Sequence, residues 1–169
     1  MNKVIVITGG QRSGKSRFAE KMALSLSEQP VYLATSRIWD DEHRQRIEHH
    51  QANRGQEWQT IEEEKELSRH DFSGKTVLVD CVTLWATNFF FDLQSDVTSA
   101  LEALKSEFEE LTRQEATFIF VTNEIGMGEM SPNSIQRKFA DLQGWFNQYM
   151  AAKADEVHLM VSGISLKIK

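Results

Sequence analysis

The sequence predicts an α/β fold with a mostly parallel sheet, helices on both faces and an antiparallel pair of strands at the C-terminal edge. Two observations carry this prediction. A run of four apolar residues, 4–7, leads into a glycine-rich loop and then a helical pattern, and further apolar runs alternate with helical patterns as far as residue 161. Such alternation is typical of parallel sheets that are covered on both sides. The 169 residues are expected to form one domain, 1–169.

The glycine-rich loop carries the strongest functional pattern in the chain. Gly9 is followed by four residues and then by Gly14, Lys15 and Ser16, which completes the phosphate-binding loop of P-loop NTPases between a strand and a helix. Glycines let backbone N–H groups surround a polyphosphate, and the helix presents its positive end to the same anion. The residues expected to bind the nucleotide here are Gly9, Gly10, Gln11, Arg12, Ser13, Gly14, Lys15 and Ser16.

The next elements follow from apolar spacing and breakers. A helix is predicted over 17–26, and a second strand over 31–35 ends in polar residues at the edge where α/β sheets bind ligands. The segment 40–54 is polar and compatible with a helix. Residues 58–61 are predicted as a short strand-like extension, and 62–69 as one or two helical turns.

The second half continues the alternation. A strand is predicted over 76–80, and an amphipathic helix begins at Val97 with Ser95 or Asp96 as its cap. A buried strand is predicted over 117–121.

The C-terminal part is expected to contain one helix and the antiparallel pair. Pro132 is placed in the first turn of the helix, whose apolar stripe is Ile135, Phe139, Leu142, Phe146 and Tyr149. The last core strand is predicted over 157–161, and Gly163 separates it from a hairpin partner at 165–168.

Two acids compete for a metal-binding role. Asp80 follows the apolar run 77–79, as the metal-ordering acid of a P-loop enzyme does, and would hold Mg²⁺ together with the Ser16 hydroxyl. Glu124 follows the next apolar strand and is the alternative. The sequence does not rank the two acids.

The polar segment 40–54 contains His43, His49 and His50. A neutral imidazole is a competent nucleophile toward phosphorus, and the nearby Arg46 could neutralise phosphate charge. Composition alone equally allows a solvated helix, a structural helix with one buried histidine, or a metal site made by the three histidines.

Composition narrows the function classes. The net charge of −6 gives no general attraction for nucleic acid or an anionic membrane, so an anionic substrate must be held by local groups. The single cysteine, Cys81, excludes an internal disulfide and fits a reducing cytoplasm, the compartment we expect. No apolar run approaches the length of a membrane span.

Several blocks in order along the chain carry a resemblance to a known family. They are TGGQRSGKS, YLATS, DDEHRQRIEHHQANR, VLVDCVTLW, TNEIGMG, FNQYMAAKADEVHLMVSG and the terminal lysines. The sequence resembles the bifunctional adenosylcobinamide kinase / adenosylcobinamide-phosphate guanylyltransferase family of cobalamin assembly. The paired histidines and the TNEIGMG block are much more specific than the phosphate loop.

The resemblance implies two reactions on one scaffold. The first transfers the γ-phosphoryl group of ATP or GTP to a hydroxyl of adenosylcobinamide, a corrinoid. The second transfers GMP from GTP, through a covalent GMP-histidine, to the new phosphate and releases pyrophosphate. The family's nucleophile falls on His50, with Lys15 as the catalytic partner in the loop. The resemblance also implies a homo-oligomer, specifically a homotrimer.

Nucleotide contacts carried over from the family extend beyond the loop, to Ala34, Thr35, Ser36, Gln51, Ala52, Asn53, Arg54, Glu62 and Leu84. The chain departs from the family pattern at two places. Glu129-Met130-Ser131-Pro132 replaces an Ile-Val-Pro-like run, and Ala140 stands where members tend to carry arginine.

Two other classes of protein share a phosphate loop and stay open from the sequence. A P-loop kinase of another small molecule would transfer a γ-phosphoryl group without forming a covalent nucleotide. A nucleotide-gated binding protein would bind nucleotide tightly and hydrolyse it slowly, without an acceptor.

Overall fold

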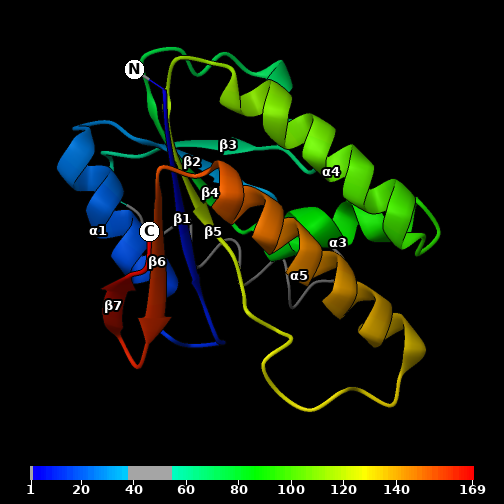
Figure 1. The fold of residues 1–169 in the computed structure, drawn as a ribbon. Helices are drawn as coiled ribbons and strands as arrows, with labels where there is room; N and C mark the ends of the chain where they lie inside the picture. The colour runs from blue at the N-terminus through cyan, green and yellow to red at the C-terminus, as the bar shows by residue number, and fades with distance from the viewer. Residues whose placement is uncertain (1, 38–54) are drawn as a thin grey trace.

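A computed structural model describes residues 2–37 and 55–169, and its core is one seven-stranded sheet (Figure 1). The strands are β1 (Lys3–Gly9), β2 (Val31–Ala34), β3 (Gln59–Glu62), β4 (Thr76–Asp80), β5 (Thr117–Val121), β6 (Glu156–Val161) and β7 (Ile164–Lys167). Their order is β3-β2-β4-β5-β1-β6-β7, and all neighbours are parallel except β6 and β7. The predicted parallel sheet with an antiparallel C-terminal edge is therefore confirmed.

Helices cover both faces of this sheet, as predicted. They are α1 (Lys15–Leu26), α3 (Val82–Asp92), α4 (Val97–Thr112) and α5 (Ser134–Lys153), with a 3₁₀ turn, η1, at Leu67–Arg69. Figure 1 shows α1 on one side of the sheet and α3, α4 and α5 on the other. In the described ranges, the helices are all too short or too polar to cross a membrane.

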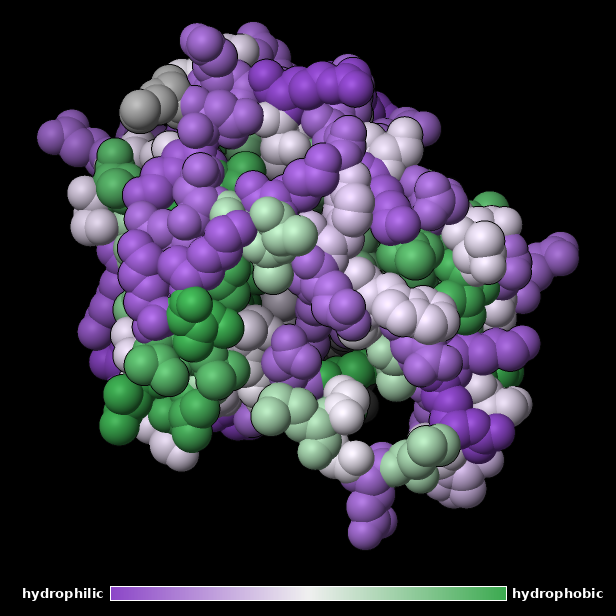
Figure 2. All heavy atoms as spheres, viewed as in Figure 1, coloured by the Kyte–Doolittle hydropathy of each residue, from purple (hydrophilic) through white to green (hydrophobic). Residues whose placement is uncertain are grey.

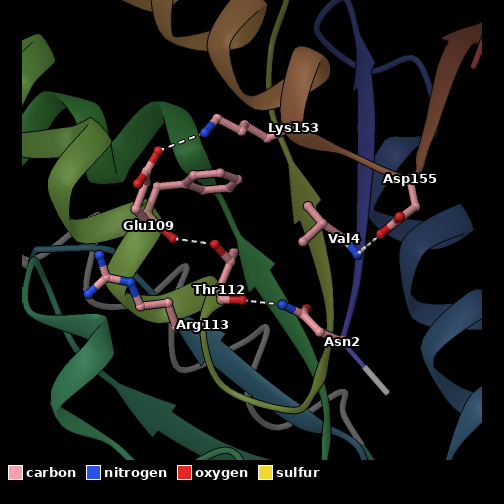
Figure 3. Close-up of a pocket in the computed structure, with 8 residues that line it drawn as sticks. Asn2, Val4, Glu109, Thr112, Arg113, Lys153 and Asp155 are labelled. Carbon is pink, nitrogen blue, oxygen red and sulfur yellow. Dashed lines mark hydrogen bonds and ion pairs between the residues drawn. The ribbon is translucent and has the colours of Figure 1, made fainter.

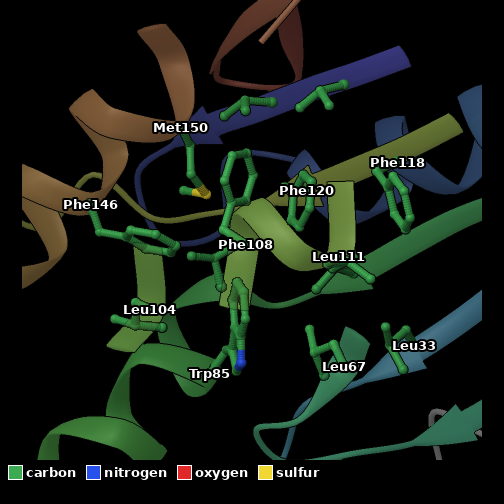
Figure 4. Packing of buried hydrophobic residues seen from close by; sticks show 14 of the residues in the cluster. Leu33, Leu67, Trp85, Leu104, Phe108, Leu111, Phe118, Phe120, Phe146 and Met150 are labelled. Carbon is green, nitrogen blue, oxygen red and sulfur yellow. The ribbon is translucent and has the colours of Figure 1, made fainter. Parts of the chain in front are cut away.

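Alternation along the strands explains why the two faces differ. In β1, Val4 and Val6 belong to the core under α3, α4 and α5, whereas Ile5 and Ile7 belong to the smaller core under α1. Successive side chains in a strand point to opposite faces, so apolar residues at every position require cover on both sides. The larger core is centred on aromatic rings, among them Phe108, Phe120, Phe146 and Trp85 (Figure 4).

Three local predictions need correction. The segment 62–69 is not a continuous helical stretch, because Glu62 closes β3 and only Leu67–Arg69 forms a 3₁₀ turn. Pro132 precedes α5 instead of lying in its first turn, since Asn133 caps the helix by accepting hydrogen bonds from the backbone N–H groups of Ile135 and Gln136. Ile135 itself is exposed and does not belong to the buried stripe.

One helix, α3, was not predicted at all. Its sequence, VTLWATNFFFD, has few polar positions, so it lacks the alternation of faces that marks an amphipathic helix. By contrast, the predicted cap of α4 is confirmed, because the Asp96 carboxylate accepts a hydrogen bond from the backbone N–H of Ser99 at 3.0 Å.

Hydrophobic side chains also lie at the surface of the C-terminal edge. Figure 2 shows apolar residues gathered over the β6–β7 hairpin, where Val161, Ile164, Leu166 and Ile168 are exposed.

Candidate active site

The carboxyl ends of the parallel strands bring the predicted site residues to one edge of the sheet. The register aligns Glu62 of β3 with Ala34 of β2, and Ala34 with Asp80 of β4. The row continues through β5 to Ile7 of β1, two residues before the phosphate loop. In open α/β sheets, ligands bind outside the carboxyl ends of the strands. Parallel pairing thus gathers residues that are far apart in the sequence.

The loop between β1 and α1 has the backbone that a phosphate cradle needs. Gly14 has φ +94°, and a Cβ there would lie 3.2 Å from Cα of Gly163. A Cβ on Gly9 would lie 2.6 Å from the carbonyl oxygen of Met160. Both positions therefore require glycine. The β6–β7 hairpin also holds the loop, because the backbone N–H of Gly163 donates to the carbonyl of Ser13 at 2.9 Å.

The start of α1 is suited to an anion. No side chain caps the helix at Gly14, and its first turn contains no acidic residue. Its first N–H groups and the positive end of its dipole thus face the loop without a protein carboxylate to neutralise them. This arrangement favours binding of a phosphate.

Lys15 is folded over the loop. Its side chain is buried, and Nζ donates to the carbonyl oxygen of Gly10 at 2.5 Å and to Oγ of Ser13 at 3.4 Å. Burial lowers the pKa of the ammonium group, and the charges of Cys81 and Asp80 oppose that shift. The interaction with Asp80 links the loop lysine to the acid at the end of β4. A bound phosphate would replace the loop acceptors of Lys15 with stronger, charged ones.

Asp80 is held in place by a residue that sequence reasoning did not identify. The hydroxyl of Tyr32, on the neighbouring β2, donates to Oδ2 of Asp80 at 2.7 Å. Tyr32 is buried, whereas Asp80 is half-buried and Ser16 is exposed. A tyrosine in an apolar strand gives no sequence signal for such a role, since its partner is 48 residues away.

The donors present fit Mg²⁺. Carboxylate and hydroxyl oxygens, from Asp80 and Ser16, are the ligands that this hard cation takes, and it usually completes its shell with water and substrate phosphates. Within residues 2–37 and 55–169, no cluster of three or more His, Cys, Asp or Glu could form a metal cage on its own. A site of one or two protein ligands plus nucleotide is consistent with both facts.

The remaining predicted contacts divide into those at this edge and those outside the described residues. Ala34 ends β2, Glu62 ends β3, and Leu84 lies in the first turn of α3, directly after Asp80 and Cys81. Thr35 is fully buried, and its hydroxyl donates to the carbonyl of Cys81 at 2.7 Å, so it ties the end of β2 to the start of α3. Ser36 follows it. His43, His49, His50, Gln51, Ala52, Asn53 and Arg54 lie outside the described residues.

Glu124, the second candidate acid, reaches the same edge. It follows β5, which lies between β4 and β1, and its backbone N–H donates to the carbonyl of Gly9 at 3.0 Å. The structure therefore brings both acids beside the phosphate loop, one on each of the two strands next to β1 and beyond. The loop that follows Glu124 carries the departure at 129–132 and exposes Met127 and Met130.

A hollow of about 380 Å³ lies elsewhere, at the amino-terminal start of β1 (Figure 3). It is lined by Asn2, Val4, Phe108, Glu109, Thr112, Arg113, Lys153 and Asp155. Most of its polar groups are already paired, for example Asp155, whose Oδ2 accepts from the backbone N–H of Val4 at 2.7 Å. It lies at the opposite edge of the sheet from the phosphate loop and is not part of the candidate site.

Comparison with solved structures supports the fold. The crystal structure of the flagellar accessory protein FlaH from Methanocaldococcus jannaschii aligns with a TM-score of 0.53 over 99% of this chain and 78% of that chain. Sequence identity is 11%, so this similarity concerns the fold alone.

Comparison with known sequences identifies the family. The family described as cobinamide kinase / cobinamide phosphate guanyltransferase matches residues 5–168. The bifunctional adenosylcobalamin biosynthesis protein CobU of Escherichia coli (strain K12) is 41% identical over 98% of this chain and 99% of its own length. CobP of Pseudomonas aeruginosa, described in the same words, is 35% identical over 97% and 96%. The chain therefore belongs to the cobinamide kinase / cobinamide phosphate guanyltransferase family and is a bifunctional transferase.

Proposed function

We propose that this chain, acting as one nucleotide-binding domain over 1–169, phosphorylates adenosylcobinamide with ATP or GTP and then transfers GMP from GTP to adenosylcobinamide phosphate. The products of the second step are adenosylcobinamide-GDP and pyrophosphate. The observation that carries the proposal is the meeting of the phosphate loop, Lys15 and Asp80 at one sheet edge, in a chain whose family membership extends over residues 5–168.

In the kinase step the chain positions and neutralises. The N–H groups of the loop and the Lys15 ammonium bind the β- and γ-phosphates, and charge that builds on the leaving oxygen is stabilised where it forms. Ser16 and Asp80 would hold Mg²⁺, which supplies further charge neutralisation when bound. Little covalent chemistry is required of the protein in phosphoryl transfer.

In the guanylyl step we assign the nucleophile to His50, by resemblance. Its ring nitrogen forms a bond to the α-phosphorus as the bond to the bridging oxygen breaks and pyrophosphate leaves. The acceptor phosphate then attacks the same phosphorus and displaces the imidazole. The segment that carries His50 leaves the described fold at Arg37. That residue lies three positions after β2 ends at the site edge, and ion pairs with Asp92 and Glu64 hold it there.

The test is incubation with Mg²⁺ and GTP labelled at the α-phosphate. We expect label on the protein that is labile in acid and stable in alkali, as a phosphoramidate is. His50→Ala should abolish it, and His49→Ala, the matched control, should retain it. Absence of label in the wild-type protein would contradict the covalent route and favour a kinase of another small molecule or a nucleotide-gated binding protein.

A second test asks whether one triphosphate cradle serves both steps. Lys15→Ala should impair both steps, whereas Lys21→Ala, on an exposed position of the same helix, should leave both unchanged. An unaltered guanylyl transfer rate in Lys15→Ala would argue for separate sites. The homotrimer that the resemblance implies is tested independently, by the mass of the particle in analytical ultracentrifugation.

A further inference from the structure

Glu124 occupies a position that the two steps above do not use. It lies directly beyond the end of β5, and β5 is the strand between β1 and β4. Its backbone is hydrogen-bonded to Gly9, the first glycine of the phosphate loop, at 3.0 Å. The side chain therefore starts between the loop that binds the triphosphate and the strand that carries Asp80.

Only one of its two carboxylate oxygens is occupied. Oε1 accepts from the hydroxyl of Thr8 at 3.0 Å and from Nδ2 of Asn147 at 3.3 Å. Over residues 2–37 and 55–169, Oε2 has no hydrogen-bond donor, and no lysine, arginine or histidine forms an ion pair with this carboxylate. One oxygen fixes the orientation of the group, and the other is available to accept a proton.

A buried network holds the donor from helix α5. Oδ1 of Asn147 accepts from the Thr122 hydroxyl at 2.7 Å and from Nε2 of Gln143 at 2.9 Å. Its Nδ2 also donates to the carbonyl of Asn123 at 3.0 Å. Thr122 and Gln143 are 0% exposed. Burying amides and hydroxyls costs free energy that apolar packing would not, so their role is better explained by the precise placement of a polar group than by stability.

We propose that Glu124 is the general base of the kinase step, a role that rests on the proposed function only for the existence of that step. The proton of the acceptor alcohol passes to Oε2 of Glu124. The alcohol oxygen forms its bond to the γ-phosphorus, and the bond from that phosphorus to the β,γ-bridging oxygen breaks. The electron pair of that bond leaves on the nucleoside diphosphate.

The guanylyl step does not need this group. Its nucleophiles are an imidazole nitrogen and then a phosphate that is already ionised, and neither is an alcohol that must lose a proton to attack. Glu124 should therefore matter for one reaction and not for the other. That asymmetry separates a general base from a ligand of a metal or a triphosphate that both reactions share.

The experiment compares Glu124→Gln with the wild-type protein in both steps. Glutamine keeps an oxygen for Thr8 and Asn147 but cannot take up the proton. General-base catalysis contributes about 10²–10⁴-fold, so we expect kcat of the kinase step to fall at least about 100-fold. Labelling of the protein by α-labelled GTP should stay within about threefold of wild type. Glu107→Gln is the matched control, because Glu107 is a half-buried glutamate that accepts a backbone hydrogen bond on α4.

Each outcome decides the proposal. Kinase activity of Glu124→Gln within threefold of wild type overturns it. So does an equal loss of both steps in a variant with the wild-type unfolding midpoint, which would place Glu124 on the shared metal or triphosphate. If Glu124→Gln unfolds early, Glu124→Asp gives the same comparison, and an unchanged ratio of the two rates overturns the proposal. Wild-type protein that takes no label while its kinase step depends on Glu124 would contradict the covalent route alone.

Discussion

Removing the Tyr32 hydroxyl tests the assignment of Asp80 as the acid that orders the metal. In Tyr32→Phe the ring stays in the core under α1, where Tyr32 is 7% exposed, and only the hydrogen bond to Oδ2 of Asp80 is lost. The carboxylate then gains rotational freedom beside Ser16. Binding of Mg²⁺ with the nucleotide should weaken, because the ligand must be ordered at the moment of binding.

The magnitude follows from the type of bond and its surroundings. A hydrogen bond to a charged group is worth about 1.5–3 kcal/mol, and about 1.4 kcal/mol corresponds to a factor of ten. Because Asp80 is half-buried, water can partly replace the lost donor, so we expect the lower part of this range. Loss of a hydrogen bond to a metal ligand typically weakens metal affinity about 10- to 100-fold. Both arguments give a loss of about tenfold.

The assay uses Mn²⁺ as a spectroscopic substitute for Mg²⁺. Its affinity in the presence of a non-hydrolysable GTP analogue is measured by electron paramagnetic resonance, and the Mg²⁺ concentration for half-maximal rate is measured in both steps. Tyr149→Phe is the matched control, since Tyr149 also donates its hydroxyl to a carboxylate, that of Glu109, but at the opposite edge of the sheet. Wild-type metal affinity in Tyr32→Phe, or equal losses in both variants, would refute the reasoning.

Two further predictions concern stability. Phe108→Ala should lower the free energy of unfolding by about 3–5 kcal/mol in urea titrations, because the ring is 1% exposed and packs 5.2 Å from Phe120 between centroids; a loss below about 1 kcal/mol would show that the core closes around the cavity. Hydrogen bonds from Lys3 and then Lys167 lower the pKa of Glu156 from 4.5 to about 2. The stability this gives is present above pH 4.5 and is lost as pH falls toward 2, so Glu156→Gln should flatten unfolding midpoints over that interval, and unchanged pH dependence would contradict it.

Local sequence signals predicted those parts of the fold that local interactions determine. The phosphate loop, the four-residue run of β1 and the cap at Asp96 each depend on residues within one or two turns of one another. The hairpin of β6 and β7 was predicted for the same reason, because Gly163 sits in the turn with φ +79°. In each of these places the chain's neighbours along the sequence are also its neighbours in space.

Where tertiary contacts decide, the sequence was less informative. Helix α3 packs Trp85, Ala86 and Phe90 into the main core and buries Asn88 against the backbone carbonyls of Thr35 and Glu64. Its polar residue thus faces inward, opposite to the pattern by which a helix is recognised. The apolar Ile135 shows the converse, since it fits the spacing of α5 but lies beyond the end of the core.

The candidate site could be predicted as an edge but not as an arrangement. Parallel strands with polar residues at their carboxyl ends must gather those residues, so Thr35, Asp80 and Glu124 were all found from the sequence. Their order across the sheet was not, because nothing local places β5 between β4 and β1. The supporting residues were missed for the same reason: Tyr32 and Asn147 bind their carboxylates from other elements, and neither lies in a recognisable motif.

That strand order gives a physical reason for two acids with different tasks. Asp80 is on β4, one strand removed from β1, yet close enough to act on the charge of Lys15, which suits an ion held between a carboxylate and the loop. Glu124 is on the intervening strand and is hydrogen-bonded to Thr8 and Gly9 themselves, which suits a group that meets the acceptor beside the terminal phosphate. Two carboxylates with one task would need no separate supports. Here a buried tyrosine holds one and a threonine and an asparagine hold the other, so each can be altered without disturbing the other, and their roles can be separated by experiment.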